Sequence, residues 1–471
     1  MAANSWPEKD ADQENSDPLN TLLSGLSDDQ LETETVPNLL NPSRFQMRRI
    51  KAALVLTIIW SSTIALHLIS WGWMLMVGLT AMLSIHAFRI IFTKPEPSPL
   101  VMEGDLPFVS VLVAAKNEET VINRLVENLC SLEYAGNYEV WIIDDNSTDQ
   151  TPKILQSLQL KYPQLNVFNR NAQASGGKSG ALNQVLSLTK GDIIAVFDAD
   201  AQLSPDLLTK VVPLFQREKV GAVQLRKAIA NADKNFWTKG QRAEMALDMW
   251  FQQQRTTIGG IGELRGNGQF VRREALDRCG GWNEETITDD LDLTVRLHLD
   301  QWDIKCVFYP PVQEEGVTNA LALWHQRSRW AEGGYQRYLD YGDLILRNTM
   351  GASKTLDLLI FVLIMYILPT ASIPDLLMSI ILHRPPILAP ITGLSLTMSV
   401  VGMFAGLQRT RLELAGKSSN SGYESNYVTL LLQTIQGTIY MLHWLVVMGI
   451  TTARMSIRPK RLKWVKTVHR G

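Results

Sequence analysis

The chain of 471 residues is poor in the side chains that bind soft metals or form disulfides. It contains only three cysteines, Cys130, Cys279 and Cys306, and their separations do not match the short spacings of zinc sites. They are therefore predicted to be free, reduced thiols with a structural role in a cytosolic domain. Without a cluster of His or Cys, any metal site is expected to use carboxylate oxygens.

The chain also has no excess of either charge sign. Its 45 Lys and Arg residues nearly balance its 47 Asp and Glu residues, so the formal net charge is −2 at pH 7. Overall charge therefore gives no reason to expect a nucleic-acid partner. Acidic residues are concentrated near the start, where large apolar residues are few and no basic stretch precedes an apolar run. Residues 1–46 are accordingly predicted to be a disordered acidic tail and not a secretory signal.

Long hydrophobic runs lie on both sides of the central region, and each is near the ~20 apolar residues needed to cross a bilayer. The runs are residues 52–69, 71–91, 356–382, 387–407 and 427–453. The chain is therefore predicted to be a multi-pass integral membrane protein. Its expected parts are a transmembrane hairpin (47–95), C-terminal transmembrane segments (355–453) and a basic tail (454–471).

Lys and Arg residues flank both ends of the hairpin and are absent from its turn. By the positive-inside rule, both ends and the region that follows face the cytoplasm. Three further spans would place the basic tail on the other side of the membrane. The positive-inside rule argues against that placement. Either the run containing Pro369, Pro374 and Asp375 is re-entrant or broken, or residues 427–453 do not cross simply. We expect a cytoplasmic tail, which could hold the protein against anionic lipid headgroups.

Two segments of the central region join a run of apolar, β-branched residues to carboxylates. They are residues 140–149 (VWIIDDNSTD) and 193–200 (IIAVFDAD). A buried parallel strand has this pattern when it brings polar side chains to a ligand at its carboxyl end. Strands are also expected near residues 108–114 and 165–168, with helices between them. The region is therefore predicted to be an α/β domain built on a parallel sheet.

Two further segments add acids and arginines. Residues 286–293 (TITDDLDL) place three aspartates where a helix should begin, and residues 326–330 (QRSRW) place two arginines beside a tryptophan. Each segment alone has an ordinary explanation, such as a helix cap, a complement to the helix macrodipole, or an amphipathic helix at a membrane surface. Their occurrence together, in this order, favours chemistry on a nucleotide donor.

In this order the segments resemble a family 2 glycosyltransferase with a GT-A fold. The matching stretches are VSVLVAAKNEE, WIIDDNSTD, GGKSGALN, VFDADA, GNGQFVRR, TDDLDL and QRSRW. The resemblance implies a GT-A (Rossmann-like) α/β catalytic domain over residues 104–345 that ends in interfacial helices. This domain would belong to an integral membrane protein with N- and C-terminal transmembrane helices. Its implied reaction is transfer of a hexose from a UDP-sugar with inversion.

The departing diphosphate must be neutralised as the glycosidic bond breaks, and a divalent cation with oxygen ligands suits this task. Asp200 is the expected metal ligand, with Mg²⁺ as the expected ion and Mn²⁺ as the alternative. Asp198 is expected nearer the donor sugar or ribose. By resemblance, Asp145 would accept from the uracil N–H, and Asn117 and Glu118 would close the base and ribose pocket.

Positive charge for the diphosphate is expected from the QRSRW segment and the glycine-rich segment. Gln326, Arg327, Arg329 and Trp330 match a Gln/Arg/Trp element of the family. Arginine suits a diphosphate because its planar fork binds two oxygens together, and Trp330 offers an aromatic wall for a sugar ring. Lys178 would add a charge near the phosphates or sugar, and the alternative is an ordinary exposed loop lysine.

The acceptor hydroxyl must lose its proton as it attacks the anomeric carbon, and one carboxylate opposite the leaving group suffices. Asp290 matches the aspartate that does this in the family and is the expected base. Asp289 replaces a glutamate of the family motif, so it is one methylene shorter, and is expected to support the site. Asp292 is expected to cap or orient the helix.

The motifs do not decide the acceptor, because polysaccharide synthases share them. Such enzymes need many helices to line a polar channel, whereas the spans here are few and show little polar lining besides Asp375 and His443. We therefore expect transfer of glucose from UDP-glucose to the free hydroxyl of 1,2-diacylglycerol, for membrane glycolipid synthesis. A processive β-polysaccharide synthase (cellulose or poly-N-acetylglucosamine type) is the alternative, and a catalytically silent membrane scaffold is another.

Overall fold

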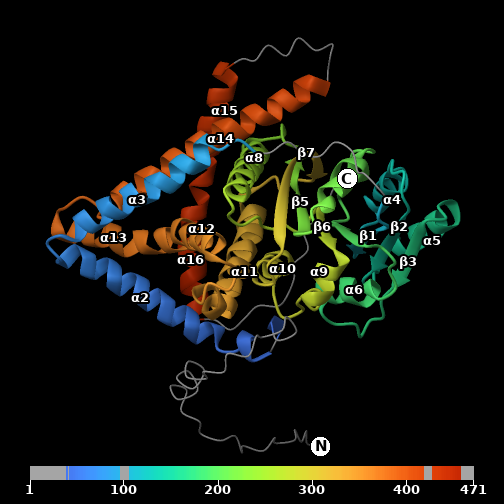
Figure 1. Ribbon diagram of the computed structural model, residues 1–471, viewed down its shortest axis with the longest axis horizontal. Coiled ribbons are helices and arrows are strands. Elements are labelled where there is room, and N and C mark those ends of the chain that lie inside the picture. Colours follow the sequence, from blue (N-terminus) through green and yellow to red (C-terminus); the bar gives the residue numbers. More distant parts are fainter. Residues whose placement is uncertain (1–38, 41, 96–104, 418–426, 458–471) are drawn as a thin grey trace, which may run out of the picture.

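The structure, a computed structural model, describes residues 39–40, 42–95, 105–417 and 427–457 (Figure 1). Seven strands form a sheet in the order β3-β2-β1-β4-β6-β5-β7. Their bounds are β1 (Val109–Ala115), β2 (Tyr138–Asp144), β3 (Leu165–Asn169), β4 (Ile193–Phe197), β5 (Val220–Ile229), β6 (Gln269–Arg272) and β7 (Asp303–Glu314). Helices cover both faces of this sheet, and a group of long helices extends away from it.

Half of the sheet has the predicted parallel arrangement. β1 pairs in parallel with β2 and with β4, and β2 pairs in parallel with β3. The residues of β1, β2 and β4 are almost all buried because helices pack on both faces. α4 (Ile122–Cys130), α5 (Thr151–Lys161) and α7 (Leu207–Val211) cover one face, and α6 (Gly177–Leu186), α9 (Arg273–Arg278) and α10 (Asp289–Leu299) cover the other. The polar residues that follow β1, β2 and β4 therefore meet at one edge.

The other half of the sheet is mixed, which the sequence did not predict. β6 runs antiparallel to β4 and β5, and β5 runs parallel to β7. β6 is only four residues long, too short for a distinctive alternation of side chains. β7 contains Pro310 and Pro311, which argue against a strand in a sequence because proline cannot donate to a ladder.

Two long helices lie between the sheet and the apolar helices. α8 (Phe236–Thr257) contacts β5 and β7 on one side and α14 (Ala389–Lys417) and α15 (Tyr427–Met441) on the other. α11 (Ala320–Leu346) contacts α10 and α16 (His443–Ile457), and it lies at the end of the region, where interfacial helices are expected. These two helices are thus the connection between the strand ends and the hydrophobic part of the protein.

Five helical segments of the described residues are long and apolar enough to cross a membrane. They comprise α2 (Arg48–Leu68), α3 (Gly72–Phe92), α12 (Ala352–Val362) with α13 (Leu368–Leu382), α14 (Ala389–Lys417), and α15 (Tyr427–Met441) with α16 (His443–Ile457). In Figure 1, α2 and α3 form a V whose closed end points away from the sheet. An α/β domain with hydrophobic helices before and after it is therefore confirmed.

α12 and α13 form one helical run, joined through a wider turn at Leu363–Ile367. Pro374 lies inside α13 without ending it, and the Asp375 carboxylate is hydrogen-bonded to His67 (2.7 Å) and to the Ile387 amide (2.9 Å). These bonds join the α2 end to the connection between α13 and α14. The run is therefore one continuous helical segment, and how it and residues 427–453 are placed in the membrane stays a prediction.

The predicted tails fall mostly outside the described residues, at positions 1–38 and 458–471. The predicted disorder does not extend to residue 46, because Pro42–Phe45 form a short 3-10 helix. Arg44 in this helix forms an ion pair with Asp343 of α11 (3.1 Å), which holds the segment against α11. The three cysteines are free thiols, as predicted.

Candidate active site

The order of the strands brings the predicted donor-site residues to one edge of the sheet. Asn117 follows β1, Asp145 follows β2 and Asp198 follows β4. β1 lies between β2 and β4 and pairs in register with both. The two segments that end in carboxylates therefore meet, as the sequence pattern predicted.

Asp145 is held by basic side chains. Arg170 donates to its carboxylate at 2.5 Å, and Lys116 lies 3.6 Å from it. The Arg170 guanidinium also donates to the carbonyl oxygens of Ser175 and Gly177. Arg170 thus fastens the glycine-rich loop to Asp145. Sequence reasoning missed it because a single arginine at a strand end has no distinguishing pattern.

Asn117 and Glu118 join the loops that follow β1 and β2. The Asn117 side-chain oxygen accepts from the Thr148 amide (2.7 Å), and the Asn117 amide donates to Ser147 Oγ (2.8 Å). Glu118 is buried, and its amide donates to Thr151 Oγ1 (2.8 Å). These bonds give the wall of the predicted base pocket a defined shape. The contacts of both residues with a nucleotide stay a prediction.

Lys178 and Asp198 form an ion pair at the centre of the site. Lys178 Nζ donates to Asp198 Oδ1 at 2.5 Å, which joins the first turn of α6 to the end of β4. Burial alone would lower the pKa of Lys178, but the carboxylates of Asp198, Asp289 and Asp290 together raise it above its ordinary value. Lys178 is therefore a cation shared by several acids and not an ordinary loop lysine.

Asp200 has different contacts from Asp198. It is buried, and its Oδ2 accepts from the amide of Glu315, just after β7 (2.9 Å), whereas the Asp198 side chain is 42% exposed. In the part of the chain that the structure describes, no group of three or more His, Cys, Asp or Glu side chains is placed to hold a metal. The carboxylate oxygens of Asp198 and Asp200 suit a hard cation. A cation bound there would need further oxygen ligands, from the nucleotide-sugar donor, to complete its coordination.

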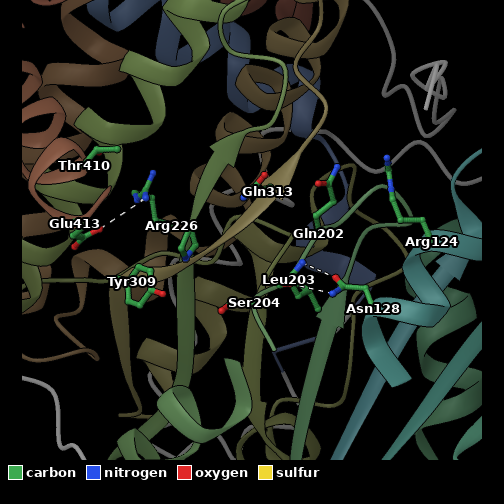
Figure 2. Close-up of a pocket in the computed structure, with 11 residues that line it drawn as sticks. Arg124, Asn128, Gln202, Leu203, Ser204, Arg226, Tyr309, Gln313, Thr410 and Glu413 are labelled. Carbon is green, nitrogen blue, oxygen red and sulfur yellow. Dashed lines mark hydrogen bonds and ion pairs between the residues drawn. The ribbon is translucent and has the colours of Figure 1, made fainter. Parts of the chain in front are cut away.

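A separate hollow of about 410 Å³ lies beside the loop that follows Asp200 (Figure 2). Asn128 of α4 accepts from the Leu203 amide on its wall (2.6 Å). On the other side, Arg226 of β5 lies 4.0 Å from Glu413 of α14. The hollow is lined by none of the predicted site residues and is distinct from the edge where the acids meet.

Asp289 and Asp290 begin α10, as predicted, and lie side by side in a half-buried part of the site. Burial and the neighbouring Asp289 carboxylate raise the pKa of Asp290 to about 6, and burial also raises the pKa of Asp289. Asp290 Oδ2 lies against Gly266, where a Cβ atom would stand only 3.3 Å from it. A carboxyl group with such a pKa is suited to accept a proton near neutral pH.

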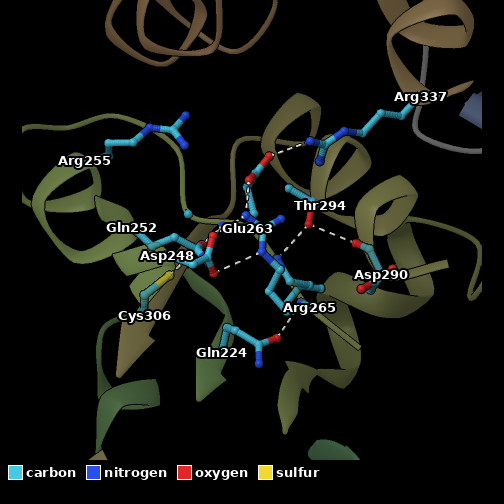
Figure 3. A network of polar contacts seen from close by, with 12 residues as sticks. Gln224, Asp248, Gln252, Arg255, Glu263, Arg265, Asp290, Thr294, Cys306 and Arg337 are labelled. Carbon is cyan, nitrogen blue, oxygen red and sulfur yellow. Dashed lines mark hydrogen bonds and ion pairs between the residues drawn. The ribbon is translucent and has the colours of Figure 1, made fainter. Parts of the chain in front are cut away.

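A buried network of ion pairs supports Asp290 (Figure 3). Glu263 forms ion pairs with Arg265 (2.8 Å) and with Arg337 of α11 (2.7 Å). The Thr294 hydroxyl donates to the Asp290 carbonyl oxygen (2.9 Å) and accepts from a backbone amide of the Glu263–Arg265 loop (2.8 Å). The network holds the loop, α10 and α11 together around the predicted base.

The contacts of Asp292 are with residues other than those of the predicted site. Asp292 is buried, forms an ion pair with Arg296 one turn further along α10 (2.7 Å), and accepts from Asn283 and Tyr341 (2.9 Å each). The negative charge of Asp292 is thus paired inside the protein. This agrees with the prediction that Asp292 orients the helix.

The QRSRW segment lies in α11, where its two arginines have different surroundings. Arg327 is fully buried and forms an ion pair with Glu244 of α8. It also donates to Gln326 Oε1 (2.7 Å) and stacks on the Trp330 ring, 3.9 Å from the ring centroid. The Arg327 guanidinium is therefore paired inside the protein, and binding of the diphosphate by Arg327 and Gln326 stays a prediction.

Arg329, by contrast, lies near the acids of the site. Burial lowers its pKa, while the Asp198 and Asp290 carboxylates act in the opposite direction. Trp330 lies beside it, with the Lys227 ammonium 5.0 Å from its ring centroid. The structure thus brings Asp198, Asp290 and Arg329 together and leaves Trp330 at their border.

Comparison with known proteins finds similar chains. Residues 110–280 match the family described as Glycosyl transferase family 2. The chain is 69% identical to the beta-monoglucosyldiacylglycerol synthase of Trichormus variabilis, over 100% of this chain and 99% of the relative. It is 55% identical to the protein of the same name from Synechocystis sp., over 98% and 97%. The mannosyltransferase PcManGT from Pyrobaculum calidifontis, solved in complex with GDP-Man and Mn2+, has 18% identity and a TM-score of 0.49, over 84% of this chain and 99% of that chain.

These matches confirm the resemblance that the motifs suggest. The motif set, together with the flanking hydrophobic runs, most resembles that of a cyanobacterial beta-monoglucosyldiacylglycerol synthase. The full-length matches confirm this narrower resemblance as well. The sheet and its two helical layers agree with the GT-A fold that the resemblance implies. Because the identity extends over nearly the whole of each relative, this chain belongs to the family 2 glycosyltransferases.

Proposed function

We propose that the protein transfers glucose from UDP-glucose to the free hydroxyl of 1,2-diacylglycerol, with inversion, to make β-monoglucosyldiacylglycerol. The observation that carries this proposal is the cluster of Lys178, Asp198, Asp290 and Arg329 at one edge of the sheet. The names of the full-length relatives support the choice of sugar and acceptor. The small number of spans favours a lipid acceptor over a growing polymer.

Asp290 is the proposed catalytic base. Its carboxylate accepts the proton of the acceptor hydroxyl while the hydroxyl oxygen attacks the anomeric carbon, and the bond from that carbon to the UDP oxygen breaks. A single displacement on an α-linked donor gives a β linkage. Lys178 and Arg329 lie on the donor side, where they stabilise the charge that develops on the diphosphate. Asp289 supports Asp290, because its neighbouring negative charge helps to raise the pKa of the base.

Asp200, with Asp198 beside it, would hold a divalent cation, and Mg²⁺ or Mn²⁺ suits these ligands. When bound, the cation supplies neutralisation of the leaving diphosphate. The Glu315 amide orients the Asp200 carboxylate without removing its charge. Asn117, Glu118 and Asp145 would bind the uracil and ribose, and Trp330 would form a wall for the sugar.

We place the catalytic domain on the cytoplasmic side of the membrane. Arg48 and Lys51, at the basic start of the hairpin, bind the catalytic region directly. Arg48 forms an ion pair with Asp340 of α11 (2.5 Å), and Lys51 donates to the Leu339 carbonyl oxygen (3.2 Å). The domain therefore lies on the side of the membrane to which the positive-inside rule assigns these basic residues.

A donor screen in mixed micelles tests the function. The purified protein with diacylglycerol is offered UDP-glucose, UDP-galactose or UDP-N-acetylglucosamine, and both UDP release and the lipid product are measured. We expect lipid-dependent release of UDP from UDP-glucose and a single β-linked glucose on diacylglycerol. A water-soluble polymer would indicate a processive synthase, and no UDP release with any donor would indicate a silent scaffold.

A further inference from the structure

The last two described helices, α15 and α16, have the length and composition of a membrane span, but both of their ends contact the catalytic side of the molecule. Near the start, Gln433 accepts from Arg411, close to the end of α14 (2.8 Å). Near the end, Arg454 forms an ion pair with Glu332 of α11 (2.8 Å). A helix pair that crossed the membrane would carry one of these ends to the closed end of the V instead.

Figure 1 shows the same arrangement. α15 and α16 follow one another across the open side of the V formed by α2 and α3, between the apolar helices and the sheet. Gly449, near the middle of α16, lies against Ile373 in the first half of α13, since a Cβ there would be 3.1 Å from the Ile373 side chain. The pair therefore lies across the direction of the spans, at their catalytic end.

An apolar stripe runs along the outer face of α15 and into the first turn of α16. Its side chains are exposed and recur alternately every four and three residues, which places them on one face of a helix. The stripe consists of Val428, Leu432, Ile435, Ile439, Leu442 and Val446. The opposite face of α15 is buried against α8 and α14, and that of α16 against α2, α11 and α13. The stripe continues the exposed apolar surface of the spans, so the partner that fits it is the same bilayer.

We propose that α15 and α16 lie in the plane of the membrane at its cytoplasmic surface, with the apolar stripe among the acyl chains just below the headgroups. Interfacial helices with one apolar face bind membranes in this way. The sequence that follows is rich in Lys and Arg, including Arg458, Lys460 and Arg461, which suits an anionic surface. This arrangement keeps the C-terminal residues cytoplasmic without an odd number of spans.

Glu244 of α8 links this membrane-bound pair to the active site. Its carboxylate accepts from the Tyr440 hydroxyl of α15 (3.0 Å) and from the Trp444 indole N–H of α16 (2.8 Å). The same carboxylate pairs with Arg327, which stacks on Trp330. Glu244 is thus a positioning residue, through which contact with the bilayer sets the orientation of the QRSRW segment.

Depth measurements test the placement without any measurement of activity. Spin labels are attached in vesicles to the full chain carrying Cys130→Ser and one of Tyr427→Cys, Leu442→Cys or Ile457→Cys, with Ser61→Cys in α2 as a deep control. We expect all three labels within ~10 Å of the same headgroup layer. A label at 427 and a label at 457 on opposite sides would show a span, and a label at 442 on the far side would show a hairpin.

The coupling, which rests on the proposed function, is tested with the double variant Tyr440→Phe and Trp444→Phe. This variant keeps an aromatic ring at each position but removes two hydrogen bonds to Glu244. We expect turnover on diacylglycerol vesicles to fall roughly tenfold, as loss of hydrogen bonds to a charged group implies. UDP affinity should stay unchanged when both proteins are assayed well below their unfolding temperatures, and Tyr162→Phe in the catalytic domain should behave as the wild type. Wild-type turnover in the double variant, or a loss of turnover that follows a loss of folded protein at the assay temperature, would overturn the coupling.

Discussion

The Lys178 ammonium group lies 2.5 Å from the Asp198 carboxylate, across the space between the glycine-rich loop and the end of β4. The same ammonium group interacts with Asp289 and Asp290 on α10. Three segments that are distant in sequence therefore form one electrostatic unit. A change to any one of these side chains is expected to alter the protonation or the position of the others.

Asp200→Asn should abolish nearly all transfer, because an amide is a much weaker ligand than a carboxylate for a hard cation. EDTA should remove the wild-type activity, and added Mg²⁺ should restore it. Lipid-dependent UDP release measures both effects. Asp206→Asn, in the same loop but paired with Lys210, is the matched control and should stay active. Full activity in EDTA would contradict the metal assignment.

Asp290→Asn should lower turnover by roughly 10²-fold or more, the scale expected for loss of a general base. Binding of UDP-glucose should change little, because this carboxylate acts on the acceptor. In this variant, turnover should therefore fall while the donor affinity measured by calorimetry stays nearly the same. A loss of affinity that matches the loss of rate would place Asp290 in the donor site.

Activity should fall in acid as Asp290 becomes protonated. The raised pKa of Asp290, about 6, means that the base is charged above this pH and increasingly protonated below it. Asp289→Asn removes a negative neighbour that helps to raise this pKa, so the midpoint of the pH profile should move to lower pH. The pH profile of turnover at saturating donor measures the shift. A midpoint that stays the same or rises would show that Asp289 does not raise the pKa of the base.

Arg329→Lys and Arg327→Lys should have different effects although the two arginines are two positions apart. Arg329→Lys should raise the KM for UDP-glucose, because lysine lacks the planar fork that binds two phosphate oxygens. Arg327→Lys should mainly lower the unfolding temperature, because Glu244 loses its paired, buried guanidinium. Donor kinetics and thermal unfolding of both variants check this. Identical behaviour would mean that both arginines face the donor.

Glu263→Gln should reduce the free energy of unfolding by roughly 3–5 kcal/mol, because it leaves buried arginines without their partner. Burial alone would raise the pKa of Glu263, but Arg337 and Arg265 hold it at about 2, below its ordinary value of 4.5. The stabilisation is therefore present above pH 4.5 and lost as the pH falls toward 2.

Thermal unfolding in detergent at neutral and acidic pH measures this effect. Glu218→Gln, at an exposed position on the same domain, is the control and should change stability by less than about 0.5 kcal/mol. Equal unfolding temperatures for the two variants at neutral pH would contradict a stabilising role for the buried network.

The sequence by itself determined the parallel half of the sheet and the edge where the acids meet. Strands buried on both faces need continuous apolar runs, and such runs are visible without any knowledge of their neighbours. Asp145 and Asp198 could therefore be placed at strand ends, and Asp290 at the start of a helix. The two hydrophobic segments before the domain were equally visible, because crossing a bilayer requires length and apolarity alone.

Only the tertiary structure decided which charged residues are available to a ligand. Arg327 and Arg329 look alike in the sequence, but one meets Glu244 across a helix interface and the other faces Asp198 and Asp290. The path of α15 and α16 was likewise hidden, because a stripe of apolar side chains suits a span and a membrane surface equally. Periodicity identifies the face of a helix, whereas the partner of that face depends on residues far away in the chain.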